Sequence, residues 1–136
     1  MSAVDPARRA IVAERLLGSP VARRLRLALA PGDMVALDLP FDAANVTEGE
    51  MVHGGVIATL IDVAAVAGAV CAARAVPDAG ATANLSIAFL APALARDLRA
   101  TPCVLRAGGR RHVVRVEVAD ADGNAVAEGL ATVVLA

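Results

Sequence analysis

The most constraining feature of the sequence is an apolar run of 20 residues in the middle of the chain, from Gly54 to Ala73. Only Thr59 and Asp62 interrupt it. A run of this length could cross a bilayer, but a carboxylate near its centre is costly in lipid, and Ala and Gly drive insertion weakly. A helix that is apolar on all sides also forms the core of water-soluble domains. We therefore expect a buried central helix over residues 54–75 and no membrane span.

Segments of alternating apolar and polar residues on both sides of this run predict β-strands. Glycine-containing turns at residues 31–33, 108–109 and 122–124 should connect neighbouring strands as hairpins. Residues 42–52 are expected to form a polar loop ahead of the central helix. The predicted strands cover residues 25–29, 35–39, 81–90, 98–106, 111–119 and 125–135.

An amphipathic helix is expected at the N-terminus, over residues 1–18. Asp5 is suited to cap it, Pro6 to occupy its first turn and Gly18 to end it. A length of 136 residues fits one domain. The sequence thus predicts a single α+β domain over residues 1–136, with the order helix, two strands, long buried helix and four strands.

The composition argues against a nucleic-acid partner. The net charge is -1, so the concentrated basic surface that phosphates require is not expected. Aromatic residues make up only 1% of the chain, which leaves no platform for stacking bases. The N-terminal arginines have acidic residues nearby, and we expect them to be solvated. They are Arg8, Arg9, Arg23, Arg24 and Arg26.

The cysteines and histidines suggest neither a disulfide scaffold nor a metal site. Cys71 and Cys103 are the only cysteines, too few for a domain held together by disulfides. The only histidines, His53 and His112, have no further ligand at a useful spacing. No apolar segment of the secretory type follows the early arginines. A cytoplasmic protein without a bound metal is therefore expected.

Three stretches of the sequence carry a family resemblance. His53–Asp62, with the sequence HGGVIATLID, places His-Gly-Gly at the start of the central helix and an acid nine positions after the histidine. Gly80–Ala93 resembles the strand that follows this helix in the same family, and Asp120–Ala131 resembles its last hairpin. Over residues 19–136 the chain resembles the hot-dog acyl-CoA thioesterases of the phenylacetate-pathway, or PaaI-like, type.

This resemblance implies a hot-dog fold, in which a curved antiparallel sheet wraps around a long central helix. It also implies hydrolysis of an acyl-CoA to the free acid and CoA. No cofactor is needed, since CoA is part of the substrate. The acyl group could be aryl, arylacetyl or medium-chain. The shape of the pocket decides which of these binds, and the sequence does not reveal that shape.

The catalytic residues that the resemblance implies are Gly54, Asp62 and Thr82. The backbone N–H of Gly54 would polarise the thioester carbonyl, because a free N–H and the dipole at a helix N-terminus favour an oxyanion. Asp62 would act as general base or as nucleophile. Thr82 matches the position of a Ser or Thr near the attacking water. The structural alternatives are a glycine needed for packing, a buried aspartate with local partners and an ordinary strand threonine.

Further residues are candidates for binding the substrate. Relatives often carry an Asn six positions and a Gly three positions before the histidine, where this chain has Thr47 and Glu50. A nearby Asn could replace the missing one. The histidine could equally be a helix cap, and the two arginines an exposed hairpin tip. The candidates are Asn45, His53, Gly55, Thr59, Arg106 and Arg110.

The spacing of Gly54 and Asp62 predicts a site shared by two chains. Eight residues correspond to ~12 Å along a helix axis, at about 1.5 Å per residue. Catalytic groups must come within roughly 3 Å of the reacting atoms. One helix can hardly present both groups to one carbonyl, so we expect a homodimer, paired further into a homotetramer, as the resemblance also implies.

Two rival functions remain open because fold alone does not determine function. The first is a hot-dog hydratase or dehydratase that acts on acyl thioesters, which measurable water addition without thiol release would identify. The second is a non-catalytic acyl-CoA-binding module, which binding without turnover across an acyl panel would identify.

Overall fold

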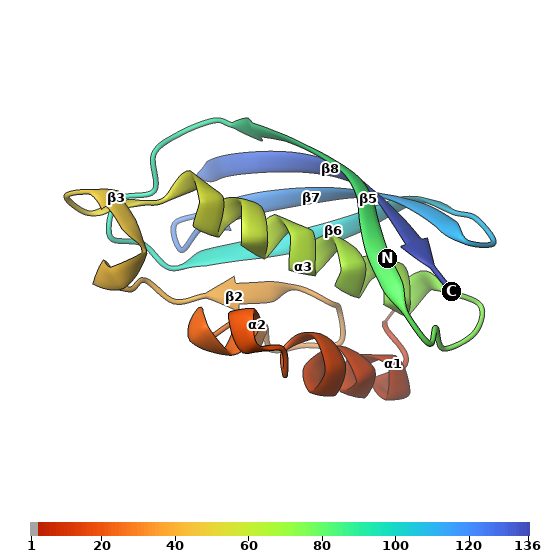
Figure 1. Ribbon diagram of the computed structural model, residues 1–136. Coiled ribbons are helices and arrows are strands. Elements are labelled where there is room, and N and C mark those ends of the chain that lie inside the picture. The colour runs from red at the N-terminus through yellow and green to blue at the C-terminus, as the bar shows by residue number, and fades with distance from the viewer. Residues whose placement is uncertain (1–2) are drawn as a thin grey trace.

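The structure, a computed structural model, describes residues 3–136. A long helix, α3, lies across a six-stranded antiparallel sheet that curves around it (Figure 1). The predicted α+β fold with a curved sheet around a central helix is confirmed. The elements are α1 (Pro6–Ile11), η1 (Val12–Leu16), α2 (Pro20–Arg24), β1 (Ala28–Leu29), β2 (Leu37–Leu39), η2 (Ala43–Asn45), β3 (Val46–Glu48), β4 (Met51–Val52), α3 (Gly54–Ala72), β5 (Gly80–Phe89), β6 (Leu98–Ala107), β7 (Arg111–Asp120) and β8 (Ala125–Leu135).

The sheet has the strand order β1-β2-β6-β7-β8-β5, and each neighbouring pair is antiparallel. The last four predicted strands agree with β5–β8 to within one residue at each end. Strand β5 lies at an edge and pairs only with β8. Its Phe89 lies opposite the buried Ala127, which places the Phe89 side chain on the side of the sheet that faces α3.

Small residues let α3 approach the sheet closely, as expected from the Ala- and Gly-rich run. A Cβ atom added at Gly68 of α3 would lie 2.8 Å from the Cβ of Pro102 on β6. A Cβ added at Gly129 of β8 would lie 2.6 Å from Cγ2 of Ile61 on α3. Real Cβ atoms essentially never come this near to other heavy atoms, so both positions require glycine at the present helix–sheet distance.

One stripe of α3 is not covered by the sheet. Thr59, Asp62, Val63 and Val66 follow the spacing of one helix face and are only half-buried. The expectation that the helix is buried all round is therefore only partly met within one chain. With a mean hydropathy of 2.1 over 18 residues, α3 is long and apolar enough to cross a membrane, but half of this stretch is buried inside the protein, as in a core helix.

The predicted central helix is too long at its C-terminal end. It ends at Ala72, and the capping residue Ala73 already has an extended backbone. Residues 42–52, predicted as a loop, contain a 3-10 turn and the small β3–β4 hairpin. This hairpin is short and has a register shift between its two residue pairs, Val46–Val52 and Glu48–Met51, so the sequence shows no clear alternation there.

The predicted strand over residues 25–29 is wrong for its first half. Ser19 caps a short helix, α2, through a hydrogen bond that its Oγ accepts from Ala22 N–H. Arg26 then has a φ angle of 56°, which turns the chain before β1 begins at Ala28. The alternation of leucines with Arg26 and Ala28 thus predicted a strand at a place where the chain forms a turn.

The N-terminal helix is confirmed at its start, although residues 1–2 of the predicted range lie outside the described residues. Asp5 caps α1 by accepting a hydrogen bond from Ala7 N–H, and Pro6 occupies the first turn. The helix continues with the wider π winding of η1 as far as Leu16. At Gly18 an added Cβ would lie 2.3 Å from the carbonyl oxygen of Glu14, which explains the glycine there.

The expectation of solvated side chains is wrong for two N-terminal arginines. Arg8 donates to the carbonyl of Val70 in the last turn of α3 and to the carbonyls of Arg74 and Ala75 just after the helix. A positive charge is favourable at this helix end. Arg9 donates to the carbonyls of Met34 and Ala30. Arg23 and Arg24 are exposed, as expected. The N-terminal segment is thereby attached to α3 and to the chain before β2.

Candidate active site

The N-terminus of α3 leaves one backbone donor free. Nδ1 of His53 accepts a hydrogen bond from Gly55 N–H at 2.8 Å, so His53 is the capping residue of the helix. Because Nδ1 is an acceptor, the neutral ring carries its proton on Nε2. Among the described residues, Gly54 N–H has no hydrogen-bond partner. This N–H is the group that the sequence predicts as the oxyanion donor, and the structure leaves it without an intramolecular partner among the described residues.

The neighbouring Gly55 is required by the histidine cap. A Cβ added at this position would lie 2.9 Å from Nδ1 of His53. The carbonyl of Gly55 accepts a hydrogen bond from the Thr59 hydroxyl at 2.9 Å. Gly55 and Thr59, predicted to bind substrate, thus already have intramolecular partners around the first turn of α3.

Asn45 lies next to the same helix start. Its backbone carbonyl accepts a hydrogen bond from His53 N–H at 2.8 Å, although the two residues are separated by the β3–β4 hairpin. Asn45 ends η2, which Asp42 caps by accepting from Ala44 N–H. The shifted loop therefore brings an asparagine to the helix start despite the departure from the family's usual spacing.

The free Gly54 N–H is beside an apolar cavity of about 390 Å³. The ring of Phe89, at the end of β5, lies 3.5 Å from the position that a Gly54 Cβ would take. This contact was not predicted. The one feature of the sequence that could have indicated this contact is that Phe89 is the single aromatic residue in the strand after the helix. The other residues lining the cavity are Thr47, Met51, Val52, Ile57, Leu90, Ala91, Pro92 and Ala93.

Asp62 lies two turns further along α3, on its uncovered stripe. The hydroxyl of Thr82 donates a hydrogen bond of 2.5 Å to Oδ1 of Asp62. Thr82 is positioned by a register irregularity in β5 between Thr82 and Asn84, which changes the alternation of the strand at this point. Both side chains are half-buried, so the carboxylate is partly desolvated yet accessible from one side.

Asp62 and Thr82 line a second cavity, of about 400 Å³, which does not contain Gly54. The Gly54 cavity in turn contains neither Asp62 nor Thr82. Within one chain the two catalytic candidates therefore open into different spaces, as their helical spacing of ~12 Å requires. The second cavity also contains Ile11, Arg15 and Leu16 of the N-terminal segment, which the sequence interpretation did not connect with the site.

Arg106 and Arg110 are exposed and lie at the tip of the β6–β7 hairpin. In Figure 1 this tip is near the chain's C-terminus, at the opposite end of α3 from Gly54. Leu135 N–H donates to the carbonyl of Arg110, which attaches the tip to the end of β8. Within one chain these arginines and the Gly54 N–H are not brought together.

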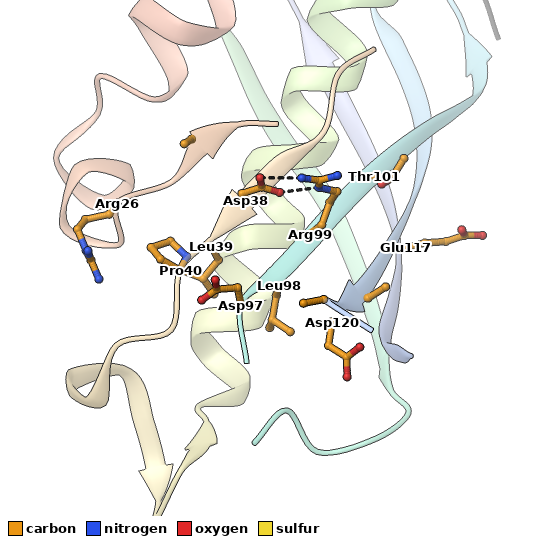
Figure 2. A pocket seen from close by; sticks show the side chains of 13 residues that line it. Arg26, Asp38, Leu39, Pro40, Asp97, Leu98, Arg99, Thr101, Glu117 and Asp120 are labelled. Atoms are coloured by element: carbon orange, nitrogen blue, oxygen red, sulfur yellow. Dashed lines mark hydrogen bonds and ion pairs between the residues drawn. The ribbon is translucent and has the colours of Figure 1, made fainter. Parts of the chain in front are cut away.

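A larger cavity, of about 590 Å³, contains none of the predicted site residues. It lies over β2, β6 and β7, where Asp38 and Arg99 face each other across two hydrogen bonds of 2.7 and 3.0 Å (Figure 2). Asp97 and Asp120 lie at its rim (Figure 2). Exposed ion pairs of this kind contribute little energy. Asp97 and Asp120 each accept a backbone hydrogen bond, from Phe41 N–H and Asn124 N–H.

The described residues contain no group of three or more His, Cys, Asp or Glu that could hold a metal ion. Burial raises the pKa of the Cys71 thiol to about 11, so at neutral pH this side chain is a protonated, weakly nucleophilic thiol. His112 is buried, and neither ring nitrogen has a hydrogen-bond partner within residues 3–136.

Comparison with known proteins gives a consistent family. No curated protein matches the chain. Among solved structures, a thioesterase family protein from Silicibacter pomeroyi is 22% identical, with a TM-score of 0.85, over 94% of this chain and 97% of that one. A conserved protein from Pseudomonas aeruginosa is 26% identical, with a TM-score of 0.80, over 91% and 99%. The PaaI protein of the Escherichia coli phenylacetic acid degradation operon is 20% identical, with a TM-score of 0.80, over 96% and 94%.

These likenesses show that the fold is the hot-dog fold predicted from the sequence. The family model of the thioesterase superfamily matches residues 49–127, which is more than half of the chain. The matched region includes the capped helix start, Asp62 and Thr82. The chain therefore belongs to the thioesterase superfamily.

Proposed function

We propose that the protein is an acyl-CoA thioesterase that hydrolyses its substrate to the free acid and CoA. The observation that carries this proposal is the half-buried Asp62 carboxylate, which Thr82 holds by a 2.5 Å hydrogen bond at the wall of a largely apolar cavity. A carboxylate so placed is poised for proton transfer or attack. Membership of the thioesterase superfamily supports the same chemistry.

In the proposed reaction, the thioester carbonyl oxygen accepts a hydrogen bond from Gly54 N–H, which becomes stronger as negative charge develops on the oxygen. Asp62 removes a proton from water while that water attacks the carbonyl carbon, or it attacks the carbon itself and the resulting anhydride is hydrolysed. The C–S bond breaks, and the CoA thiolate takes up a proton. No oxidation state changes, so the reaction needs no redox cofactor. With Asp62 as base or nucleophile, we propose that it needs no metal either.

We propose further that Gly54 and Asp62 of each site come from different subunits of a homodimer. The uncovered stripe of α3, with Thr59, Val63 and Val66 around Asp62, supports this proposal, because half-exposed apolar side chains favour a partner surface. The edge strand β5 continues that surface with Phe89, which is 56% exposed. A two-fold axis near Thr59 would bring each Gly54 towards the partner's Asp62. Pairing of such dimers into a tetramer is part of the proposal.

The capping role of His53 favours hydrolysis over the rival hydratase chemistry. A hydratase would use this histidine as an acid or base, but its Nδ1 is already engaged with Gly55 N–H. Asp62 instead has an accessible side towards the cavity. The same geometry would also suit a module that binds acyl-CoA without cleaving it, which the following experiment distinguishes.

The first test measures thiol release and product mass with a panel of acyl-CoA substrates. The Asp62→Asn variant should lose roughly 100-fold or more in kcat, the range expected for a positioned acid–base group. Product mass is needed because Cys103 could react with thiol reagents. Unchanged turnover in Asp62→Asn would refute the role of Asp62, and binding without turnover in the wild type would indicate the binding module.

The second test removes the Gly54 N–H without disturbing the helix. Proline is well tolerated at the first helical position, and His53 already has the extended backbone that proline requires before it. Gly54→Pro should lower kcat by about 100-fold, as loss of one oxyanion donor does. Gly54→Ala is the matched control, because it keeps the N–H and places a Cβ in ordinary contact with Phe89 at 3.5 Å. Equal activity of the Pro and Ala variants would exclude an oxyanion role for this N–H.

A further inference from the structure

The cavity beside Asp62 is formed where the N-terminal helical segment crosses the uncovered side of α3. Ile11 and Leu16 form one wall, and Val63, Val66 and Val70 form the other. Both walls are aliphatic. Strand β5 contributes Thr82 near the carboxylate, so the catalytic pair and the apolar walls share one continuous space.

The polar groups around this cavity already have intramolecular partners. The two terminal nitrogens of Arg15 donate to the carbonyls of Pro77 and Asp78, each at 2.7 Å. The Ser19 hydroxyl donates to the Leu16 carbonyl at 2.8 Å. Because these donors are engaged, the walls offer a bound group mainly aliphatic contact.

The dimensions of the cavity limit the group that it can hold. Asp62 and Val70 are eight residues apart on α3, or ~12 Å at about 1.5 Å per residue. The far end is bounded by the buried residues Val70, Pro77 and Leu135. An extended alkyl chain advances by roughly 1.3 Å per carbon, given a C–C bond of about 1.5 Å, so about eight to ten carbons would span this length.

We propose that this cavity holds the acyl chain, that the substrate is a medium-chain aliphatic acyl-CoA, and that Leu16 and Ile11, which form the wall opposite α3, limit the space for that chain. The proposal rests on the thioesterase function proposed above and selects one of its possible acyl groups. A volume of about 400 Å³ is near the lower end for small-molecule sites. None of the lining residues is aromatic, so an aryl group would find no ring to stack on.

Binding of S-alkyl-CoA thioethers tests the proposal, because these analogues lack the thioester carbonyl and are not hydrolysed. Calorimetry should show affinity that rises from the ethyl through the butyl to the octyl thioether by about fourfold per methylene, the factor equivalent to about 0.8 kcal/mol. It should then level off at the dodecyl thioether, which exceeds the cavity. The 2-phenylethyl thioether should bind more weakly than the octyl one.

Two substitutions of Leu16 should shift this series in opposite directions, which a general loss of folding could not do. Leu16→Phe fills the cavity and should lower octyl affinity by about tenfold, with butyl affinity unchanged. Leu16→Ala widens the cavity and should let the affinity continue to rise from the octyl to the dodecyl thioether, where the wild type shows no further gain. Val21→Phe is the matched control, because Val21 is 48% exposed on α2 and does not line the cavity.

The outcomes separate this inference from the proposed function. If the Leu16 variants give the wild-type series, or if the phenylethyl thioether binds best, the acyl-chain assignment is overturned even when Asp62→Asn abolishes hydrolysis. If the series shifts as expected but no acyl-CoA is hydrolysed, the assignment holds and the thioesterase proposal fails. If none of the thioethers binds, the acyl-chain assignment is rejected, and if in addition no acyl-CoA is hydrolysed, both are rejected.

Discussion

At the scale of single residues, the contact between Thr82 and Asp62 is the most informative feature of the site. The hydroxyl has one strong acceptor, Oδ1 of Asp62 at 2.5 Å, and orients the carboxylate towards the cavity. Hydrogen bonds to a charged group contribute about 1.5–3 kcal/mol. Thr82→Val keeps the branched shape of the side chain but removes this donor, so we expect kcat to fall by about tenfold or more, with KM little changed.

The control for this variant is Thr101→Val, on β6, where the threonine does not contact Asp62. Thr82→Ser should restore most of the lost activity, because it returns the hydroxyl. A Thr82→Val enzyme with wild-type kcat would mean that Thr82 is an ordinary strand residue, the alternative that the sequence left open.

At the scale of secondary-structure elements, the close approach of α3 to β6 depends on Gly68. An alanine in a helix is more favourable than glycine by about 1 kcal/mol. Its Cβ would, however, lie 2.8 Å from the Pro102 ring, which cannot rotate away, and overpacking of this kind costs about 1–3 kcal/mol. Gly68→Ala should therefore lower the free energy of unfolding by about 1 kcal/mol, measured by urea denaturation. Gly109→Ala is the control, because the added Cβ meets no atom within 4 Å. The urea concentration at the midpoint of its unfolding should hardly change.

At the scale of the whole molecule, the separate cavities of Gly54 and Asp62 make the proposed site a property of the dimer. Mixing inactive Asp62→Asn and Gly54→Pro subunits, after unfolding and refolding together, should restore activity. Half of the dimers would then be mixed, and each would have one intact site of two, so about a quarter of wild-type activity is expected. Mixtures that stay inactive, or a fully active monomer in light scattering, would contradict the shared site.

Much of the fold could be read from local patterns. The strands β5–β8 follow from period-two alternation between glycine turns, and Asp5-Pro6 marks a helix start, because these signals depend on neighbouring residues alone. The first half of the strand predicted over residues 25–29 failed because the alternation was followed there and the helix start at Ser19-Pro20 was missed. Ser19 and the positive φ of Arg26 make a helix and a turn, and local alternation does not reveal them.

The candidate residues of the site could also be named from the sequence, through the motif that begins at His53 and ends at Asp62. What only the tertiary structure decided is how distant segments surround that motif. The N-terminal segment crosses α3, and its Ile11 and Leu16 therefore line the cavity beside Asp62. Arg8 of the same segment donates to a carbonyl near the end of α3. Such contacts join residues about 50 or more positions apart in the chain, and their energy comes from packing and hydrogen bonding between elements. No pattern within a single segment encodes them, whereas caps, periodicity and the spacing of Gly54 and Asp62 are set by the order of residues itself.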